Sequence, residues 1–253
     1  MIQISIPAEI QRAINDGAIF YVSHSGGKDS QAMYAALLRE IIPHEQIVVV
    51  HANLGNVEWP GVIDHIKKNI THELNIVQAE KTLLGMVAAR GMWPSARYRQ
   101  CTSDLKRNPI QKFIRNDLKL RGKTLAVDCT GIRAQESVNR AKRQSFAINK
   151  TLTNSNRTVY NWLPIFSLST EQVFQIIKNV GQKPFWAYEQ NERLSCVFCI
   201  MGNRNDLRHG AERNPELYRR YVELERKIDH TMFTKNGQPI PLEQYLDIPI
   251  TNI

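Results

Sequence analysis

The feature that most constrains this chain is a short loop with two glycines between an apolar run and a helix-forming run. The apolar residues 18–22 are followed by Ser-His-Ser-Gly-Gly-Lys-Asp-Ser from Ser23 to Ser30, and then by a segment that favours a helix. In such a strand–turn–helix unit, backbone N–H groups can close around an anion because Gly26 and Gly27 carry no Cβ atom. The N-terminus of the helix directs its positive end at the same anion. The loop therefore predicts a phosphate or pyrophosphate site, with further donors from Ser23, Ser25, Lys28 and Ser30.

Two better-known phosphate loops do not fit this stretch. A Walker A loop requires glycine where this chain has Val22, and serine or threonine where it has Asp29. The dinucleotide fingerprint Gly-x-Gly-x-x-Gly is absent. The alternative without a ligand is a tight turn whose lysine is incidental.

The composition indicates a folded protein with an affinity for anions. With 253 residues, of which 42% are hydrophobic, the chain can bury one large core or two modest ones. There is no apolar run of the ~18 residues that span a bilayer, and the start lacks a secretory signal, so we expect a cytoplasmic protein without a membrane partner. The net charge of +9 suits a nucleic acid or a phosphate-rich substrate.

Alternating apolar and polar segments predict an α/β fold. We expect strands at residues 18–23, 47–50, 75–79, 124–129, 146–148 and 158–162, and helices at residues 31–40, 62–74, 82–90, 111–118 and 170–180. Ligands of open parallel sheets lie beyond the carboxyl ends of the strands. His51 and Asn53 follow one such end and Gly131 and Arg133 another, so we expect them beside the phosphates, although the first two could instead be loop caps. We place a domain boundary at 165/166, which gives a nucleotide-binding domain (1–165) and a helical C-terminal region (166–253).

The cysteines form a second centre of chemistry. Cys196 and Cys199 have the C-x-x-C spacing that binds one metal ion or one cluster, and Cys101 lies in a segment rich in arginine and lysine that would favour its thiolate. A metal or cluster at Cys101, Cys196 and Cys199 competes with a redox-active dithiol and with purely structural thiols. The fourth ligand is left open between His209, Cys129, a substrate and no protein group. Cys129 itself reads as a buried strand residue.

Taken together, these segments resemble a known family. The Ser25–Ser30 loop resembles the pyrophosphate loop of ATP pyrophosphatases, which cleave ATP between its α and β phosphates. The loop, the Cys101 segment, the segment 130–137 and the Cys196–Cys199 segment, in this order, resemble the phosphoadenosine phosphosulfate reductase family. The resemblance implies an adenine-nucleotide α-hydrolase-like parallel sheet with helices on both faces. Members include sulfonucleotide reductases, the small subunit of ATP sulfurylase and the iron–sulfur component of DNA phosphorothioation systems.

Three features of this sequence indicate which of these members it most resembles. No cysteine follows Cys199, Cys101 stands alone, and the pyrophosphate loop is intact. Sulfonucleotide reductases generally have a C-terminal catalytic cysteine, adjacent cluster cysteines and a degenerate loop, whereas ATP sulfurylase subunits generally lack the cysteine cluster. The pattern is therefore most similar to phosphorothioation-type members.

The resemblance implies an ATP-dependent sulfur-transfer enzyme that binds ATP, Mg²⁺ and an iron–sulfur cluster, of the 4Fe–4S type. Lys28, Asp29 and Arg133 would act in catalysis, with Asp29 holding Mg²⁺ or orienting the loop. Nucleic acid is the favoured acceptor, a cysteine desulfurase or another sulfur donor would supply sulfur, and a homo-oligomer is compatible with this role. The alternatives are a sulfonucleotide reductase with a thiol carrier, an adenylyltransferase similar to ATP sulfurylase, and a non-catalytic nucleotide-binding module.

Overall fold

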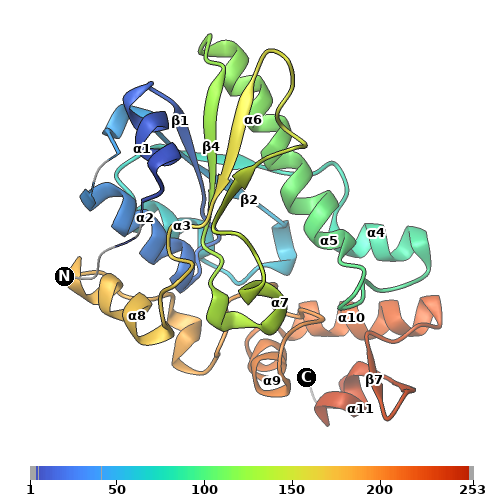
Figure 1. Ribbon diagram of the computed structural model, residues 1–253. Coiled ribbons are helices and arrows are strands. Elements are labelled where there is room, and N and C mark those ends of the chain that lie inside the picture. The colour runs from blue at the N-terminus through green and yellow to red at the C-terminus, as the bar shows by residue number, and fades with distance from the viewer. Residues whose placement is uncertain (1–3, 5, 41, 251–253) are drawn as a thin grey trace. The chain divides into compact units, whose positions relative to one another are not determined.

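A six-stranded sheet is the centre of the first of two units into which the chain divides (Figure 1). The computed structural model describes residues 4, 6–40 and 42–250. In the order β3-β2-β1-β4-β6-β5, all neighbours pair in parallel except β5, which is antiparallel to β6. The strands are β1 (Ile19–Ser23), β2 (Ile47–Ala52), β3 (Leu74–Val77), β4 (Leu125–Thr130), β5 (Phe146–Ile148) and β6 (Thr158–Trp162). This topology confirms the predicted α/β class and adds an antiparallel edge strand.

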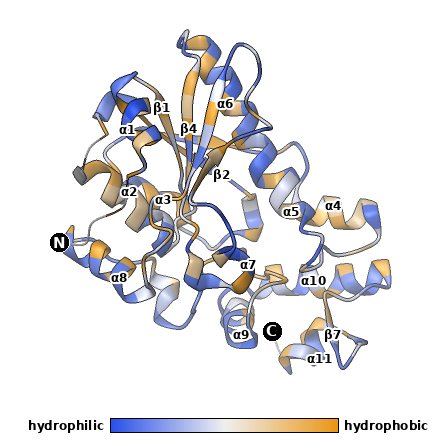
Figure 2. Ribbon diagram, in the orientation of Figure 1, coloured by the Kyte–Doolittle hydropathy of each residue, from blue (hydrophilic) through white to orange (hydrophobic). Residues whose placement is uncertain are grey.

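Helices cover both faces of this sheet, as the sequence predicts. Phe20 and Val22 of β1 face one core, which is shared with α1 (Ala8–Asn15), α2 (Lys28–Glu40) and α8 (Thr170–Asn179). The intervening residue Tyr21 faces a second core shared with α6 (Asn108–Leu120). Successive strand side chains point to opposite faces, so a strand covered on both sides is apolar throughout. Figure 2 shows that the central strands are largely hydrophobic, whereas α6, which covers one face of the sheet, alternates between polar and apolar residues.

Most predicted helices and strands are present near their predicted bounds. The expected helix at residues 62–74 is too long, since α3 (Val62–Asn69) ends early and Leu74 opens β3. The helix expected at residues 170–180 is α8 (Thr170–Asn179), and the Ser169 hydroxyl caps its start by accepting from the Gln172 backbone N–H. The predicted domains 1–165 and 166–253 include residues 1–3, 5, 41 and 251–253, which lie outside the described residues.

The division into units differs from a single cut at 165/166. The first unit comprises the residues up to Ala52, Gly61–Val77 and Ile110–Phe185, and the second comprises Asn53–Pro60, Gln78–Pro109 and the residues from Trp186 onward. α8 stays with the first unit because its apolar side chains share the core of α2. The second unit is thus built from three separate stretches, which a boundary sought in sequence order misses.

The second unit is mainly helical, as predicted for the C-terminal region. Its elements are η2 (Gly55–Val57), α4 (Leu83–Arg90), α5 (Gln100–Thr102), the π-helical η3 (Ser103–Arg107), η5 (Trp186–Glu189), α9 (Arg204–Arg213), α10 (Pro215–Ile228), β7 (Phe233–Lys235), β8 (Gln238–Ile240) and α11 (Leu242–Leu246). The β7–β8 hairpin was not predicted, although its turn residues Asn236 and Gly237, both at positive φ, are the usual signal for one. No helix of the described residues is long and apolar enough to cross a bilayer.

Candidate functional site

The glycine loop lies at the carboxyl end of β1 and is closed by its own hydrogen bonds. The Ser30 hydroxyl donates to the Gly27 carbonyl (2.9 Å) and accepts from the Ser25 backbone N–H (3.1 Å). Gly26 adopts a φ of +77°, which a residue with a Cβ rarely tolerates. The first-turn N–H groups of α2 follow directly, and such groups have no carbonyl partner within their helix. The structure therefore brings Ser25, Gly26, Gly27 and Ser30 into one small ring at a helix N-terminus.

His24 holds this loop to the neighbouring strand β2, a role that the sequence analysis missed. Its buried ring accepts the Gly26 backbone N–H at Nδ1 (3.1 Å), and its own backbone N–H donates to the Val50 carbonyl (2.8 Å). Burial, with smaller effects from His51 and His65, lowers the pKa of His24 to about 3, so the ring is neutral at pH 7. The neutral ring can accept a hydrogen bond at Nδ1. The sequence position of His24, between the strand and Gly26, is the feature from which this supporting role could have been predicted.

Arg133 and Lys28 both contact the carboxylate of Asp29. The Arg133 Nε donates to Asp29 Oδ1 (2.6 Å), and the Lys28 ammonium lies 3.4 Å from Oδ2. The Arg133 side chain is almost fully buried, and its guanidinium also donates to Gln135 (2.9 Å), the Leu168 carbonyl (3.2 Å) and Thr170 (3.2 Å). Arg133 thus positions Asp29 and ties the loop after β4 to the start of α8. Its expected contact with phosphate stays a prediction.

Gly131 brings the loop after β4 against the first turn of α2. A Cβ atom at this position would lie 3.0 Å from the Asp29 carbonyl carbon, 3.1 Å from its oxygen and 3.1 Å from the Ser30 nitrogen. These neighbours are backbone atoms, which cannot rotate away. Gly131 therefore permits a close approach that sets the position of Asp29 and Ser30.

The substitution Gly131→Ala is expected to weaken nucleotide binding about tenfold or more, because the displaced backbone carries the anion-binding N–H groups. Isothermal titration with a non-hydrolysable ATP analogue measures the change. Gly85→Ala is the matched control: its Cβ would also meet an atom at 3.0 Å, but this atom is the Thr82 hydroxyl, which can move. Equal affinities of the Gly131→Ala chain and the unaltered chain would contradict this role.

The remaining predicted nucleotide residues are distributed between the units. Ser23 ends β1 in register with Val50 and Thr130, and His51 Nδ1 donates to the His24 carbonyl (2.9 Å). Asn53 belongs to the second unit, where its side chain accepts the Gly55 backbone N–H (2.7 Å). This bond is the loop cap that the sequence left as the alternative for Asn53.

The three predicted cysteine ligands all lie in the second unit. Burial raises the pKa of Cys101 and raises that of Cys196 to about 12, and the charge of Cys199 acts on both thiols in the same direction. The sequence led us to expect a Cys101 thiolate stabilised by basic neighbours, whereas burial favours the protonated thiol of Cys101. The three thiols are therefore within electrostatic range of one another, and each of the three cysteines is half-buried.

Lys106 is the main cation that acts on these thiols. It lies on η3, and its charge lowers the pKa of Cys101 and of Cys196. Burial lowers the pKa of Lys106 itself, but Cys196, Glu58, Cys199 and Cys101 raise it above its usual value overall. An ammonium group among three thiols suits a sulfur-rich site that carries negative charge when it is loaded.

The geometry of this cysteine group is not that of a closed metal site. Within the described residues, no three His, Cys, Asp or Glu side chains gather in an arrangement that could hold a metal ion. His209, one predicted fourth ligand, bonds to Asn191 (2.7 Å), and Cys129, the other, is fully buried in β4. The prediction that Cys129 is a buried strand residue is confirmed.

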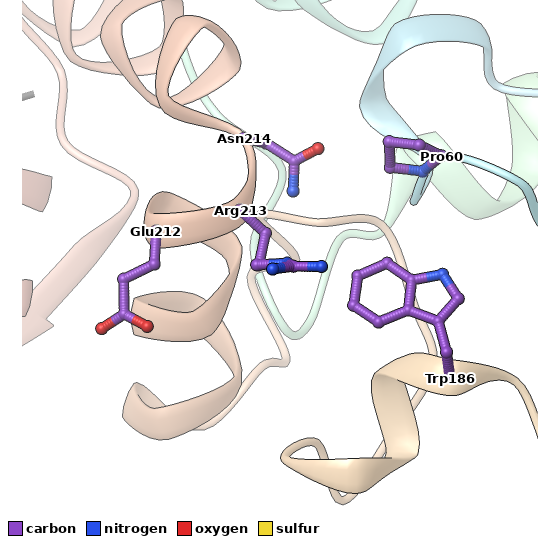
Figure 3. Close-up of a pocket in the computed structure, with 5 residues that line it drawn as sticks. All are labelled: Pro60, Trp186, Glu212, Arg213 and Asn214. Atoms are coloured by element: carbon purple, nitrogen blue, oxygen red, sulfur yellow. The ribbon is translucent and has the colours of Figure 1, made fainter.

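A pocket of about 290 Å³ also lies in the second unit, lined by Pro60, Trp186, Glu212, Arg213 and Asn214 (Figure 3). The Arg213 guanidinium lies 5.1 Å from the centre of the Trp186 ring, which is a cation–π contact. Trp59 packs edge-on against Trp186 with 5.5 Å between ring centres. The wall of this pocket thus combines an aromatic ring with a planar guanidinium cation. Both kinds of group form stacking surfaces for nucleic-acid bases.

A mostly parallel open sheet whose first strand runs through two glycines into a helix N-terminus defines a nucleotide-binding α/β protein. The chain belongs to the phosphoadenosine phosphosulfate reductase domain family, whose family model matches residues 19–205. The match covers the glycine loop, Arg133 and all four cysteines, and confirms the resemblance noted from the sequence.

Two curated proteins are similar to this chain at low sequence identity. An uncharacterized 37.8 kDa protein of Escherichia phage 186 is 23% identical over 94% of this chain and 85% of its own length. An uncharacterized protein of Methanocaldococcus jannaschii is also 23% identical, over 81% of this chain, but the chain spans only 41% of that relative.

Two solved structures show a weak likeness. The phosphoadenylyl-sulfate reductase of Candida auris, in a phosphate complex, has a TM-score of 0.42 at 14% identity, over 72% of this chain and 91% of that chain. The FMN adenylyltransferase of Candida glabrata, in complex with ATP, has a TM-score of 0.38 at 15% identity, over 69% and 58% respectively.

Proposed function

We propose that the chain is an ATP-dependent sulfur-transfer enzyme that cleaves ATP to AMP and pyrophosphate. The observation that carries the proposal is the closed glycine loop at the N-terminus of α2, with Lys28 and the Arg133-held Asp29 beside it. Backbone N–H groups and a lysine in this arrangement suit a chain of phosphates that bears several charges. An intact loop of this type favours a triphosphate substrate over one without pyrophosphate.

The proposed reaction has two displacements. An oxygen of the acceptor attacks the α-phosphorus of ATP, the bond from this phosphorus to the bridging oxygen of the β-phosphate breaks, and pyrophosphate leaves. A sulfur nucleophile then attacks the acceptor atom that bears the adenylated oxygen, and AMP leaves with that oxygen. Lys28 stabilises the charge that develops on the phosphates. Asp29, held by Arg133, orients the loop and would contribute an oxygen ligand to Mg²⁺.

We further propose that Cys101, Cys196 and Cys199 hold an iron–sulfur cluster, which would supply an iron site able to bind sulfur. The fit rests on the three thiols, whose charges act on one another, and on the half-buried Lys106, which would offset the thiolate charge. Nucleic acid is the proposed acceptor class. The net charge of +9 and the Arg213–Trp186 pair support it, because bases stack on such surfaces.

Anaerobic incubation with MgATP labelled at the α-phosphate, a sulfide donor and candidate acceptors tests this function. We expect labelled AMP in an amount equal to pyrophosphate, formed only when an acceptor is present. Lys28→Ala is expected to reduce the rate by about 10²–10³, the usual cost of losing one transition-state charge donor. Nucleotide binding without turnover for RNA, DNA and small acceptors would instead identify a non-catalytic binding module.

Reduction of a sulfonucleotide is the second candidate, and membership of this reductase family favours it. In that reaction the bound sulfate group is reduced by two electrons to sulfite, while two thiols are oxidised to a disulfide. Sulfite release from a sulfonucleotide and a thiol carrier, with no pyrophosphate from ATP, would select this function.

A further inference from the structure

The pocket of the second unit contains an aromatic ring whose position is set by its neighbours (Figure 3). Trp186, the first residue of η5, is half-buried. Trp59 meets its ring at an interplanar angle of 84°, and His209 meets it at 89° with 5.8 Å between ring centres. Both neighbours are buried, and aromatic rings in edge-to-face contact hold one another in place. Trp186 is therefore a preformed part of the pocket wall.

Arg213 supplies a planar cation beside this ring. It is the last residue of α9 and is exposed, and its guanidinium lies 5.1 Å from the centre of the Trp186 ring. Within the described part of the chain, no carboxylate forms a salt bridge with Arg213. Figure 3 shows the guanidinium directed towards Trp186, whereas the Glu212 carboxylate points away from it. The charge of Arg213 is thus available to an anionic ligand of the pocket.

The size and the polar groups of this pocket suit one flat ring system. Its volume of about 290 Å³ far exceeds that of a water molecule (~30 Å³) and lies at the lower end of the range for small-molecule sites (~300–1,000 Å³). Asn214 is held at the junction of α9 and α10, because its backbone N–H (2.9 Å) and its Nδ2 (3.2 Å) both donate to the Gly210 carbonyl. Its amide oxygen is left as an acceptor for a ring N–H or amino group of a base.

A further exposed pair of arginine and aromatic ring lies in the same unit. The Arg97 guanidinium is 5.3 Å from the centre of the Tyr98 ring, and Tyr98 is 65% exposed. Arg90 and Arg99, close by in sequence, are exposed as well. Proteins that bind single-stranded nucleic acids combine basic side chains, which contact the phosphates, with aromatic rings on which the bases stack. The second unit therefore carries this combination both in the pocket and outside it.

We propose that the pocket binds one unpaired base of a single-stranded nucleic acid, which stacks against the Arg213–Trp186 pair. In a duplex, neighbouring base pairs cover both faces of each base, so only an unpaired base exposes the surface that stacking requires. The charge of Arg213 also favours the phosphates that flank this base. The inference rests on the proposed function and narrows its acceptor from nucleic acid in general to an unpaired stretch.

The test measures how the full chain, without ATP, binds a short fluorescein-labelled oligothymidylate by fluorescence anisotropy. Thymine is used because it offers no adenine to the glycine loop. We expect Arg213→Ala to weaken binding about tenfold, which is the size of effect that the loss of one stacking contact produces. Arg204→Ala is the matched control, because it removes the same charge from the exposed start of the same helix. It should weaken binding less than about threefold, through charge alone.

An abasic strand of the same length is the control on the ligand side, because it keeps the phosphates and lacks the bases. The unaltered chain should bind it about tenfold more weakly than oligothymidylate, and Arg213→Ala should then lose no more affinity than Arg204→Ala. Stacking on Trp186 should also quench tryptophan emission when oligothymidylate binds. We expect this quenching to be absent in Trp186→Phe, which keeps an aromatic ring and the other three tryptophans.

Four results would overturn the proposal. They are equal affinities for the thymidylate and abasic strands, equal affinities for the single strand and its duplex, equal losses in Arg213→Ala and Arg204→Ala, and thymidine monophosphate binding as tightly as the strand. Because ATP is absent from these measurements, a chain that fails to cleave ATP can still bind the strand through this pocket. A chain that cleaves ATP can likewise fail to bind it, so the two proposals are tested separately.

Discussion

Replacing Arg133 with alanine is expected to lower the free energy of unfolding of the first unit by about 3–5 kcal/mol. The substitution removes the Nε donor from Asp29 and leaves a partly buried carboxylate with Lys28 as its remaining cationic contact. It also deprives the Leu168 carbonyl and Thr170 of their donors at the start of α8. Urea unfolding followed by circular dichroism measures the loss, and nucleotide affinity should fall with it because Asp29 is no longer fixed.

Arg12→Ala is the control for a surface arginine of the same unit. Its ion pair with Glu9 is long (3.8 Å), and the two side chains are 72% and 48% exposed. Such pairs contribute less than about 1 kcal/mol. If Arg133→Ala unfolded at the same urea concentration as Arg12→Ala, the positioning role of Arg133 would be wrong. If its stability fell but ATP affinity were kept, Arg133 would be structural without a part in nucleotide binding.

Replacing Cys196 with serine is expected to reduce iron bound after anaerobic reconstitution by about tenfold or more, because a neutral hydroxyl replaces a thiolate ligand. The same loss is expected for Cys101→Ser and Cys199→Ser. Iron and zinc per chain, together with the visible absorption of the cluster, measure the result. Zinc without iron in the unaltered chain would keep the metal site but would remove the sulfur-carrying role.

Cys129→Ala separates metal binding from the general effect of losing a cysteine. Cys129 is fully buried in β4 within the apolar core, and its thiol has a strongly raised pKa, first through burial and then through Asp128. We expect this variant to lose some stability and to keep its iron. Iron loss in Cys129→Ala equal to that in Cys196→Ser would show that the assignment of the cluster ligands is wrong.

The strand–loop–helix unit was accessible from the sequence because its determinants are local. The apolar run before Ser23, the Gly26–Gly27 pair and the helix-forming residues after it are consecutive, and each fixes backbone conformation over a few residues. Apolar runs also predicted the central strands, and the predicted helix at residues 170–180 begins where α8 begins. The C-x-x-C spacing identified a pair of thiols that share one turn.

What the tertiary structure decided depends on residues far apart in the chain. Arg133 and Asp29 are separated by more than a hundred positions, and their contact exists because β4 lies beside β1 in the sheet. The same pairing places Asp128 in register with Tyr21, where burial raises the pKa of this carboxyl to about 7, which its sequence neighbours gave no reason to expect. The second unit likewise combines three stretches that are separate in sequence: Asn53–Pro60, Gln78–Pro109 and the residues from Trp186 onward.

By itself, the sequence determined the class of the sheet, the glycine loop and the identity of the thiols, because local pattern sets backbone conformation and chemistry. Only the tertiary structure decided which groups those thiols and carboxylates face, and therefore their charge. Burial raises the pKa of Cys101, which basic neighbours in sequence would lower, and it also raises the pKa of Cys196. Desolvation depends on the packed surroundings of a group, and these are assembled from distant parts of the chain.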